Sequence, residues 1–160
     1  MEENNEMIEV KEAEISNLED ILNLNQQLFN YEYENFDKTL NCNWPPNNLK
    51  YFKEAIIKDD SLALVVFIED KIIGYLIGSI EKAEVYRKIK QIAEIDDMFI
   101  IPEYRGKGIG VLLYKRFIKW AKKKGINRVR VVASAQNVKT INFYKKNKLK
   151  EYDLILESDI

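Results

Sequence analysis

The 160-residue sequence contains no histidine and only one cysteine, Cys42. Without histidine, the chain lacks the usual nitrogen ligand of zinc and the usual base of a serine or cysteine triad. A single cysteine cannot form an internal disulfide, and we assign its thiol no catalytic role because no histidine is present to activate it. Any catalysis must therefore rest on carboxylates, tyrosine, lysine or backbone groups, and we expect no metal.

Two further absences concern membranes and polyanions. No apolar run approaches the ~20 residues that a membrane-spanning helix needs, and residues 1–10 are acidic where a signal peptide is basic and then apolar. Lys and Arg together number 25 and Asp and Glu 26, so the net charge of −1 provides no field that would attract nucleic acid. We therefore expect a cytoplasmic protein with neither a nucleic-acid nor a membrane partner.

What the chain does contain fits one globular domain. Hydrophobic residues make up 46% of the sequence and charged residues 32%, a balance that fills a core and still solvates the surface. The length of 160 residues suits one compact domain, and no repeat or linker-like segment divides it. We expect a single domain over residues 1–160.

Residue periodicity predicts a sheet with helices on its faces. The expected strands, where apolar residues alternate or β-branched residues cluster, are residues 7–13, 61–68, 72–80, 89–101, 128–133 and 152–156. The expected helices are residues 16–33, with Ser16 and Glu19 as a capping box, and residues 49–58, 109–124 and 138–146. This order of elements predicts an α/β (α+β) fold.

A glycine-rich turn lies between the fourth expected strand and the helix that follows it. Its residues are Arg105, Gly106, Lys107, Gly108, Ile109 and Gly110. Glycines let the backbone approach a ligand closely, and a helix N-terminus adds N–H groups, so the turn fits a phosphate or pyrophosphate. The alternative is a purely structural turn. The pattern is not a Walker motif, because no Gly-Lys-Ser/Thr follows, and it is a poor dinucleotide fingerprint.

Two segments carry a family resemblance. The segment from Ile95 to Gly110 is IDDMFIIPEYRGKGIG. It resembles the acetyl-CoA motif, Arg/Gln-x-x-Gly-x-Gly/Ala, of the GNAT superfamily of N-acetyltransferases. The segment from Asn137 to Tyr144, NVKTINFY, is similar to the Asn-x6-Tyr segment of that family. Lys148 and Leu149 replace the family's Gly-aromatic pair, so we expect Asn147 to supply the left-handed helix end.

The resemblance implies a fold and a cofactor site. The fold would be a GNAT-like mixed, twisted, splayed sheet of about six to seven strands flanked by about four helices. The co-substrate would be acetyl-CoA, with its pyrophosphate on the amides of residues 105–111 and its pantetheine arm along the strand. The implied cofactor-binding residues are Met98, Phe99, Ile100, Arg105, Gly106, Lys107, Gly108, Ile109, Gly110, Val111, Asn137 and Tyr144.

Tyr144 and a carboxylate would carry the chemistry. By the resemblance, Tyr144 would protonate the departing thiolate, a step that a phenol can perform; helical spacing alone would favour a core aromatic, and the match to the second motif reverses that preference. A base would remove the proton of the amine, and Glu94 and Asp96 are the candidates. Period two places these two on one face of the strand and Asp97 on the other, unless a bulge intervenes. The alternative is that such acids are merely solvated or paired with Lys107 or Arg128.

The acceptor side is defined less closely. Glu32, Glu34 and Asp37 could form an acidic rim for a cationic amine, since this loop borders the acceptor site in the family, and Trp44 could line that pocket or fill the core. Asp96-Asp97-Met98 is similar to the Glu-Asp-aromatic sequence of polyamine-type members. The lysines of residues 115–124 fit a solvated helix face better than a nucleic-acid site.

The sequence thus predicts an N-acetyltransferase that transfers an acetyl group to a primary amine by direct attack in a ternary complex. A small polyamine or amino-acid amine is the favoured acceptor, and a protein N-terminus or lysine is the second. A non-catalytic acyl-CoA-binding domain is the alternative of another class. The last expected strand, residues 152–156, could form the edge of a homodimer.

Overall fold

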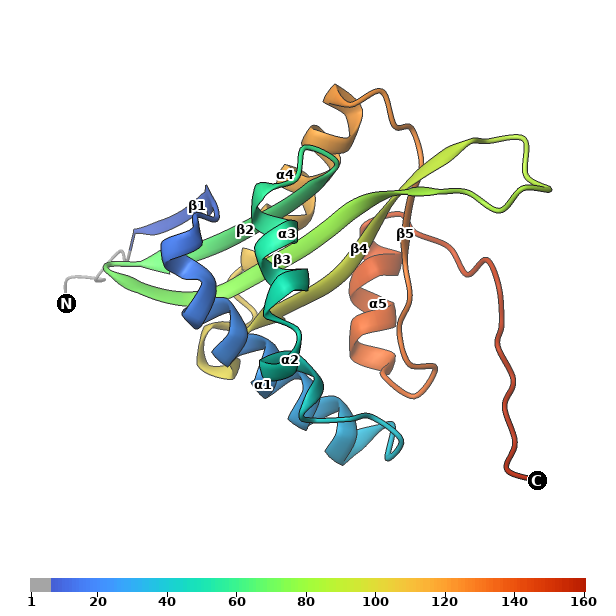
Figure 1. The fold of residues 1–160 in the computed structure, drawn as a ribbon, viewed down its shortest axis with the longest axis horizontal. Coiled ribbons are helices and arrows are strands. Elements are labelled where there is room, and N and C mark those ends of the chain that lie inside the picture. Colours follow the sequence, from blue (N-terminus) through green and yellow to red (C-terminus); the bar gives the residue numbers. More distant parts are fainter. Residues whose placement is uncertain (1–6) are drawn as a thin grey trace.

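The computed structural model describes residues 7–160, in which a single five-stranded sheet forms the framework (Figure 1). The strands are β1 (Ile8–Glu12), β2 (Ser61–Ile68), β3 (Lys71–Lys82), β4 (Gln91–Ile100) and β5 (Val129–Val131), and they lie side by side in this order. β1 to β4 pair antiparallel, whereas β5 runs parallel to β4. The sheet is therefore mixed, as predicted.

Helices cover both faces of the sheet (Figure 1). They are α1 (Leu18–Asn35), α2 (Trp44–Asn47), α3 (Leu49–Ile57), α4 (Ile109–Lys123) and α5 (Val138–Lys146), with the 3₁₀ turns η1 (Ile15–Asn17) and η2 (Pro102–Tyr104). Ile21 of α1 and Phe52 of α3 pack in one hydrophobic cluster with the odd-numbered residues of β2. Leu113 and Phe117 of α4 pack in the other with the even-numbered ones. No helix within residues 7–160 is long and apolar enough to span a bilayer.

The α/β fold class is confirmed, with fewer strands than the six or seven expected. The predicted strand over residues 152–156 is wrong: these residues have no strand structure, are exposed, and run away from the sheet (Figure 1). Alternation of apolar residues predicts a strand only where a neighbouring edge pairs with it, and no strand of residues 7–150 does so. The outermost paired strand on this side is the short β5.

Two predicted helix ends are wrong by a few residues. The capping pair before α1 is Glu14 with Asn17, not Ser16 with Glu19, because the Asn17 side chain accepts the Glu14 N–H at 2.9 Å across a 3₁₀ turn. At the end of α5, Lys148 (φ 72°) is left-handed and Asn147 (φ −91°) is not. The N–H of Leu149 bonds to the Tyr144 carbonyl and that of Lys148 to the Lys145 carbonyl, which is a Schellman end.

Candidate functional site

β4 and β5 pair over a short length and then diverge. Their parallel register runs only from Ala93 opposite Val129 to Ile95 opposite Val131. β4 then continues to Ile100, whereas the chain after β5 turns toward α5. Parallel strands that separate in this way leave one edge of β4 without a neighbouring strand, which is the splayed geometry that the resemblance implied.

A bulge at Asp96 decides which groups of β4 face that edge. Ile77 of β3 pairs with Asp97 and Gly78 with Ile95, so Asp96 is an extra residue in the ladder. A side chain at Gly78 would not fit there, because a Cβ atom would lie 2.5 Å from the Glu94 carbonyl oxygen. The bulge shifts the alternation of the strand by one residue, so that main-chain and side-chain directions change at this point.

Hydrogen bonds on either side of the bulge fix the directions of the main-chain groups. Before it, the N–H of Ala93 donates to the Arg128 carbonyl on the β5 side; after it, the N–H of Ile101 donates to Ile73 on the β3 side, each at 2.9 Å. By the alternation of an antiparallel ladder, Phe99 points its groups at β3, whereas Met98 and Ile100 point theirs at the β5 side. The Ile100 carbonyl accepts the Arg105 Nε–H there at 2.8 Å.

The same shift places three carboxylates on one face of the sheet. Glu94, Asp96 and Asp97 all line a single pocket on the α1 and α3 face. Asp97 contacts Asn25 of α1, and Asp96 contacts Tyr51 of α3. The prediction from strict period two, that Asp97 lies on the opposite face, is therefore wrong. The bulge interrupts the alternation on which that prediction was based.

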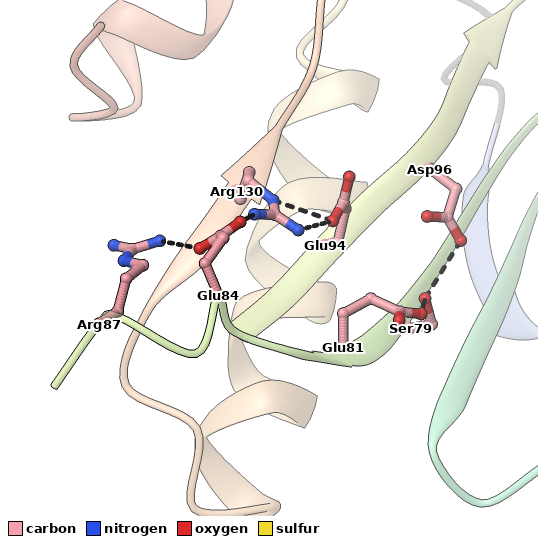
Figure 2. Close-up of polar contacts among 7 residues, drawn as sticks. All are labelled: Ser79, Glu81, Glu84, Arg87, Glu94, Asp96 and Arg130. Carbon is pink, nitrogen blue, oxygen red and sulfur yellow. Dashed lines mark hydrogen bonds and ion pairs between the residues drawn. The ribbon is translucent and has the colours of Figure 1, made fainter. Parts of the chain in front are cut away.

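Glu94 is held in an ion-pair cluster (Figure 2). Arg130 of β5 donates to Glu94 through Nε at 2.9 Å and Nη2 at 2.5 Å, and its Nη1 contacts Glu84 at 2.6 Å. Glu84 also pairs with Arg87 at 3.2 Å, and its own backbone N–H, with the two arginines, lowers the pKa of Glu84 to about 2. The partner of Glu94 is thus Arg130, neither Lys107 nor Arg128, and the cluster ties the β3–β4 connection to β5.

Asp96 and Asp97 form no ion pair with a lysine or arginine of residues 7–160, and their pKa values lie near neutrality. The Asp96 carboxylate accepts hydrogen bonds from the hydroxyls of Tyr51 at 3.3 Å and Ser79 at 3.4 Å. Desolvation by the pocket walls, followed by the charges of Asp97 and Glu94, raises the pKa of Asp96 to about 7. Burial raises the pKa of Asp97 to about 6 against the opposing hydrogen bond from Asn25. Both carboxyls can therefore exchange protons at neutral pH.

The pocket that contains these acids is about 570 Å³ in volume and has an aromatic wall. Trp44 stacks on Phe29 at 5.7 Å between ring centroids and meets Tyr51 edge-on at 5.3 Å, and all three line the pocket. Trp44 also packs against the α1 and α3 cluster, so it both fills the core and lines the pocket. The remaining lining residues are Thr39, Leu40, Asn41, Ser79, Glu81, Glu94, Ile95, Asp96, Asp97 and Val132. The lining thus combines four acids with aromatic rings and includes no lysine or arginine of residues 7–160.

The acids expected at the rim lie elsewhere. Glu32 accepts a hydrogen bond from the Asn137 side chain at 3.3 Å, and its partial burial raises its pKa. Asp37 is half-buried and accepts hydrogen bonds from the hydroxyl and N–H of Thr39, while Glu34 is exposed. None of the three lines the pocket, whose acids come from β3 and β4. The sequence carried one overlooked signal for Glu81, since it follows Ser79 by two residues at the polar end of a strand.

Asn137 and Tyr144 lie at the other side of the divergence, on α5. The Asn137 side chain caps the helix by accepting the Thr140 N–H at 3.2 Å, in addition to its bond to Glu32. Tyr144 is 5% exposed and packs edge-on against Tyr114 and Phe143. Burial, then the charges of Tyr114 and Asp97, raises the pKa of Tyr144, so its phenol stays protonated at neutral pH.

The glycine turn opens to solvent directly after η2. Gly106 (φ 78°) and Gly108 (φ 80°) are both left-handed, and a Cβ atom on either would meet nothing within 4 Å. The first helical hydrogen bond of α4 runs from the Leu112 N–H to the Gly108 carbonyl, so the preceding N–H groups of the helix have no acceptor within it. The first N–H groups of α4 thus have no acceptor within the helix, and they follow a turn that has open space at Gly106 and at Gly108.

Asp97 gives a test of this electrostatic description. Its folded pKa of about 6 exceeds the ordinary 3.8, so the native state binds more protons between these pH values and loses stability as the pH rises through that window. Asp97→Asn removes this penalty. Its stability relative to the wild type should therefore increase by about 2 kcal/mol from pH 4 to pH 7.5, as measured by urea unfolding.

Asp37→Asn is the matched control, because hydrogen bonds from Thr39 lower the pKa of Asp37. Because this pKa lies below the ordinary 3.8, the stability of Asp37→Asn relative to the wild type should stay nearly constant from pH 4 to pH 7.5 and should rise only as the pH falls below about 4. An Asp97→Asn difference that stays constant with pH would contradict the assigned burial of this carboxyl.

Comparisons with known proteins agree with this geometry. The model of the acetyltransferase (GNAT) family matches residues 19–148. An uncharacterized N-acetyltransferase of Methanocaldococcus jannaschii is 32% identical over 111 residues, which cover 66% of this chain and 46% of that protein. The spermidine N(1)-acetyltransferase of Thermoplasma acidophilum is 29% identical over 155 residues, or 91% of this chain and 90% of that protein.

Among solved structures, a predicted acetyltransferase of Clostridium acetobutylicum with acetyl-CoA superimposes with a TM-score of 0.77 at 18% identity, over 96% of each chain. This likeness concerns the fold. The chain spans about half the length of the Methanocaldococcus relative. The family match, by contrast, covers the bulged strand, the glycine turn and α5 together. The chain belongs to the acetyltransferase (GNAT) family.

Proposed function

We propose that the protein transfers an acetyl group from acetyl-CoA to a primary amine of a small cationic molecule, a polyamine or an amino acid, by direct attack in a ternary complex. The observation that carries this proposal is the pocket of four carboxylates and three aromatic rings beside the open edge of β4. Its charge favours a cation, and its rings favour an ammonium group through cation–π attraction. The match to a spermidine acetyltransferase over 90% of that protein supports the same substrate class.

For the acetyl donor, we propose that the amides of residues 105–111 hold the pyrophosphate. The open space at Gly106 and Gly108 and the N–H groups at the start of α4 support this assignment for the later amides of the turn. The Arg105 N–H donates to the Pro102 carbonyl at 3.1 Å, so its amide is not supported in the same way. Met98 and Ile100, whose main-chain groups point to the β5 side, would pair with the pantetheine arm. Phe99 would not, because its register directs its groups to β3.

Gly108→Glu should lower the affinity for acetyl-CoA by at least about 100-fold. The new side chain would project into the open space, repel phosphates and displace charge-assisted hydrogen bonds of ~1.5–3 kcal/mol each. Calorimetry on the folded variant measures the effect. Gly125→Glu is the matched control, since Gly125 is also left-handed (φ 78°) with open space, but it lies at the other end of α4. Equal affinities in the two variants would contradict the assignment.

For the base, we propose Asp96. An alkylammonium group with a pKa of ~10 must lose a proton before it attacks the thioester. Asp96 has a raised pKa of about 7 and opens into the pocket. Glu94 is held by Arg130, and Asp97 is more deeply buried behind Asn25, so both are less available. The oxyanion that forms would accept a hydrogen bond from the Met98 N–H, which faces the open edge of β4.

For the acid, we propose Tyr144, because burial keeps its phenol protonated. Tyr144→Phe keeps the ring and removes the proton, so kcat should fall by about 10²- to 10⁴-fold while acetyl-CoA binding is nearly unchanged. Tyr114→Phe is the control: its ring lies 6.4 Å from that of Tyr144 in the same cluster, and its hydroxyl bonds to the Asn147 carbonyl instead. A Tyr144→Phe enzyme with wild-type kcat, when product release is not limiting, would make Tyr144 a packing aromatic only.

The substrate class is tested with matched pairs of amines. Release of free CoA thiol is measured with diamines and with monoamines of equal chain length. Wild-type enzyme should show a lower KM for diamines than for monoamines, since Glu81 also lines the pocket and can pair with the second ammonium group while Asp96 acts on the first; the Ser79 hydroxyl donates to Glu81 at 2.9 Å. Glu81→Gln should raise KM about 5- to 10-fold for diamines and leave monoamines unchanged, whereas Glu34→Gln should change neither.

The same panel separates the alternatives. Faster turnover of peptide N-termini or lysines would favour a protein acetyltransferase, and acetyl-CoA binding without turnover of any amine would favour a non-catalytic sensor domain. The homodimer stays a prediction, and it loses its proposed edge because residues 152–156 form no strand. The cytoplasmic location also stays a prediction.

A further inference from the structure

Asn25 is a polar residue in the middle of an apolar cluster. It lies on α1, is fully buried, and neighbours Ile21 and Leu24 on the face that packs against the sheet. Its Nδ2 donates to the Tyr75 hydroxyl at 2.7 Å and to the Asp97 carboxylate at 3.2 Å. Its Oδ1 is buried and has no hydrogen-bond partner within residues 7–160. A leucine would pack here without leaving a buried acceptor unsatisfied, so packing alone does not account for the amide.

We propose that Asn25 is a positioning residue that orients Asp97 and holds it as a carboxylate behind Asp96, so that the charge of Asp97 sets the proton affinity of the base. The proposal rests on the proposed function in one respect, the assignment of Asp96 as the base. Its geometric basis is independent of that assignment: the bulge turns Asp97 onto the α1 face, and the Asn25 amide meets it there.

Asp97 occupies a place from which its charge reaches titratable groups on several elements of the site. The groups that face it are Asn25 and Glu32 from α1, Tyr51 from α3, Tyr75 from β3, Asp96 from its own strand and Tyr144 from α5. Negative charge at Asp97 raises the pKa of Asp96 and of all three tyrosines. None of these neighbours is a cation, so the amide of Asn25 is the hydrogen-bond donor that favours the ionised form.

Asn25 thereby acts on the base through one intervening side chain. A donor to the carboxylate lowers the pKa of Asp97, while burial and Glu32 raise it. When Asp97 is ionised, Asp96 binds its proton more tightly and is a stronger base toward an ammonium group. When Asp97 is protonated, this repulsion vanishes and Asp96 becomes a weaker base. The two carboxyls titrate as a coupled pair, and Asn25 decides which of them receives the first proton.

Titration of the carboxyl carbons by ¹³C NMR tests the proposal without any turnover. In Asn25→Leu, the midpoint of Asp97 should move up and that of Asp96 down, each by about half to one pH unit. Tyr75→Phe is the matched control, because it removes the other partner of the Asn25 amide and should leave both midpoints within about 0.2 units. Unchanged midpoints in folded Asn25→Leu would overturn the proposal.

Asp97→Asn covers the case in which Asn25→Leu does not fold. The midpoint of Asp96 should fall in this variant, and an unmoved midpoint overturns the proposal just as directly. If the wild type acetylates no amine, the proposed function fails while these titrations still decide the role of Asn25.

With an active wild type, the pH profile of kcat/KM provides the second readout. The acidic limb should move to lower pH by about half to one unit in Asn25→Leu and in Asp97→Asn, and no further in the double variant. Tyr75→Phe should not move it. A loss of kcat at every pH with an unmoved limb would show that Asn25 serves the structure only.

Discussion

The extra residue at Asp96 in β4 is the constraint on which both halves of the site depend. Before it, the main-chain groups of Ala93 face β5; after it, those of Met98 and Ile100 do so. The same one-residue shift turns Asp97 toward α1, beside Asp96. A regular strand would offer one of these arrangements without the other, because side-chain and main-chain directions alternate together. An open strand edge and an acidic pocket thus arise from one irregularity.

Close packing on the opposite side of the sheet keeps this strand in place. A Cβ atom at Gly78 would lie 2.4 Å from the Phe117 ring of α4, so the helix packs directly onto the ladder where the bulge occurs. Arg130 fastens β4 to β5 just before the strands diverge, through two hydrogen bonds to Glu94 (Figure 2). The bulge is therefore bounded by a helix on one face and an ion pair at one edge, which limits how far β4 can move.

Local patterns in the sequence were enough for the order of elements and for the glycine turn, because periodicity, β-branching and positive-φ glycines act over a few residues. They were not enough for the bulge, since a bulge is a property of the register between β3 and β4. The contact between Asn25 and Asp97 joins residues 72 positions apart and has no local signal. Residues 152–156 show the converse error, because alternation predicted a strand for which the chain supplies no partner.

The charges of the pocket also bear on which amine the proposed reaction would use. Of the four lining carboxylates, Glu94 is paired with Arg130, whereas the charges of Asp97 and Glu81 both raise the pKa of Asp96, and no lysine or arginine of residues 7–160 lines the pocket. In the proposed mechanism, a monoamine that passes its proton to Asp96 neutralises that carboxylate but leaves Asp97 and Glu81 without a counter-charge. A diamine gives up one proton and keeps the other ammonium group, which replaces the missing counter-charge. In the proposed mechanism, the charge of that retained ammonium group would also lower the pKa of Asp96, so that the protonated base would release its proton more readily after the transfer.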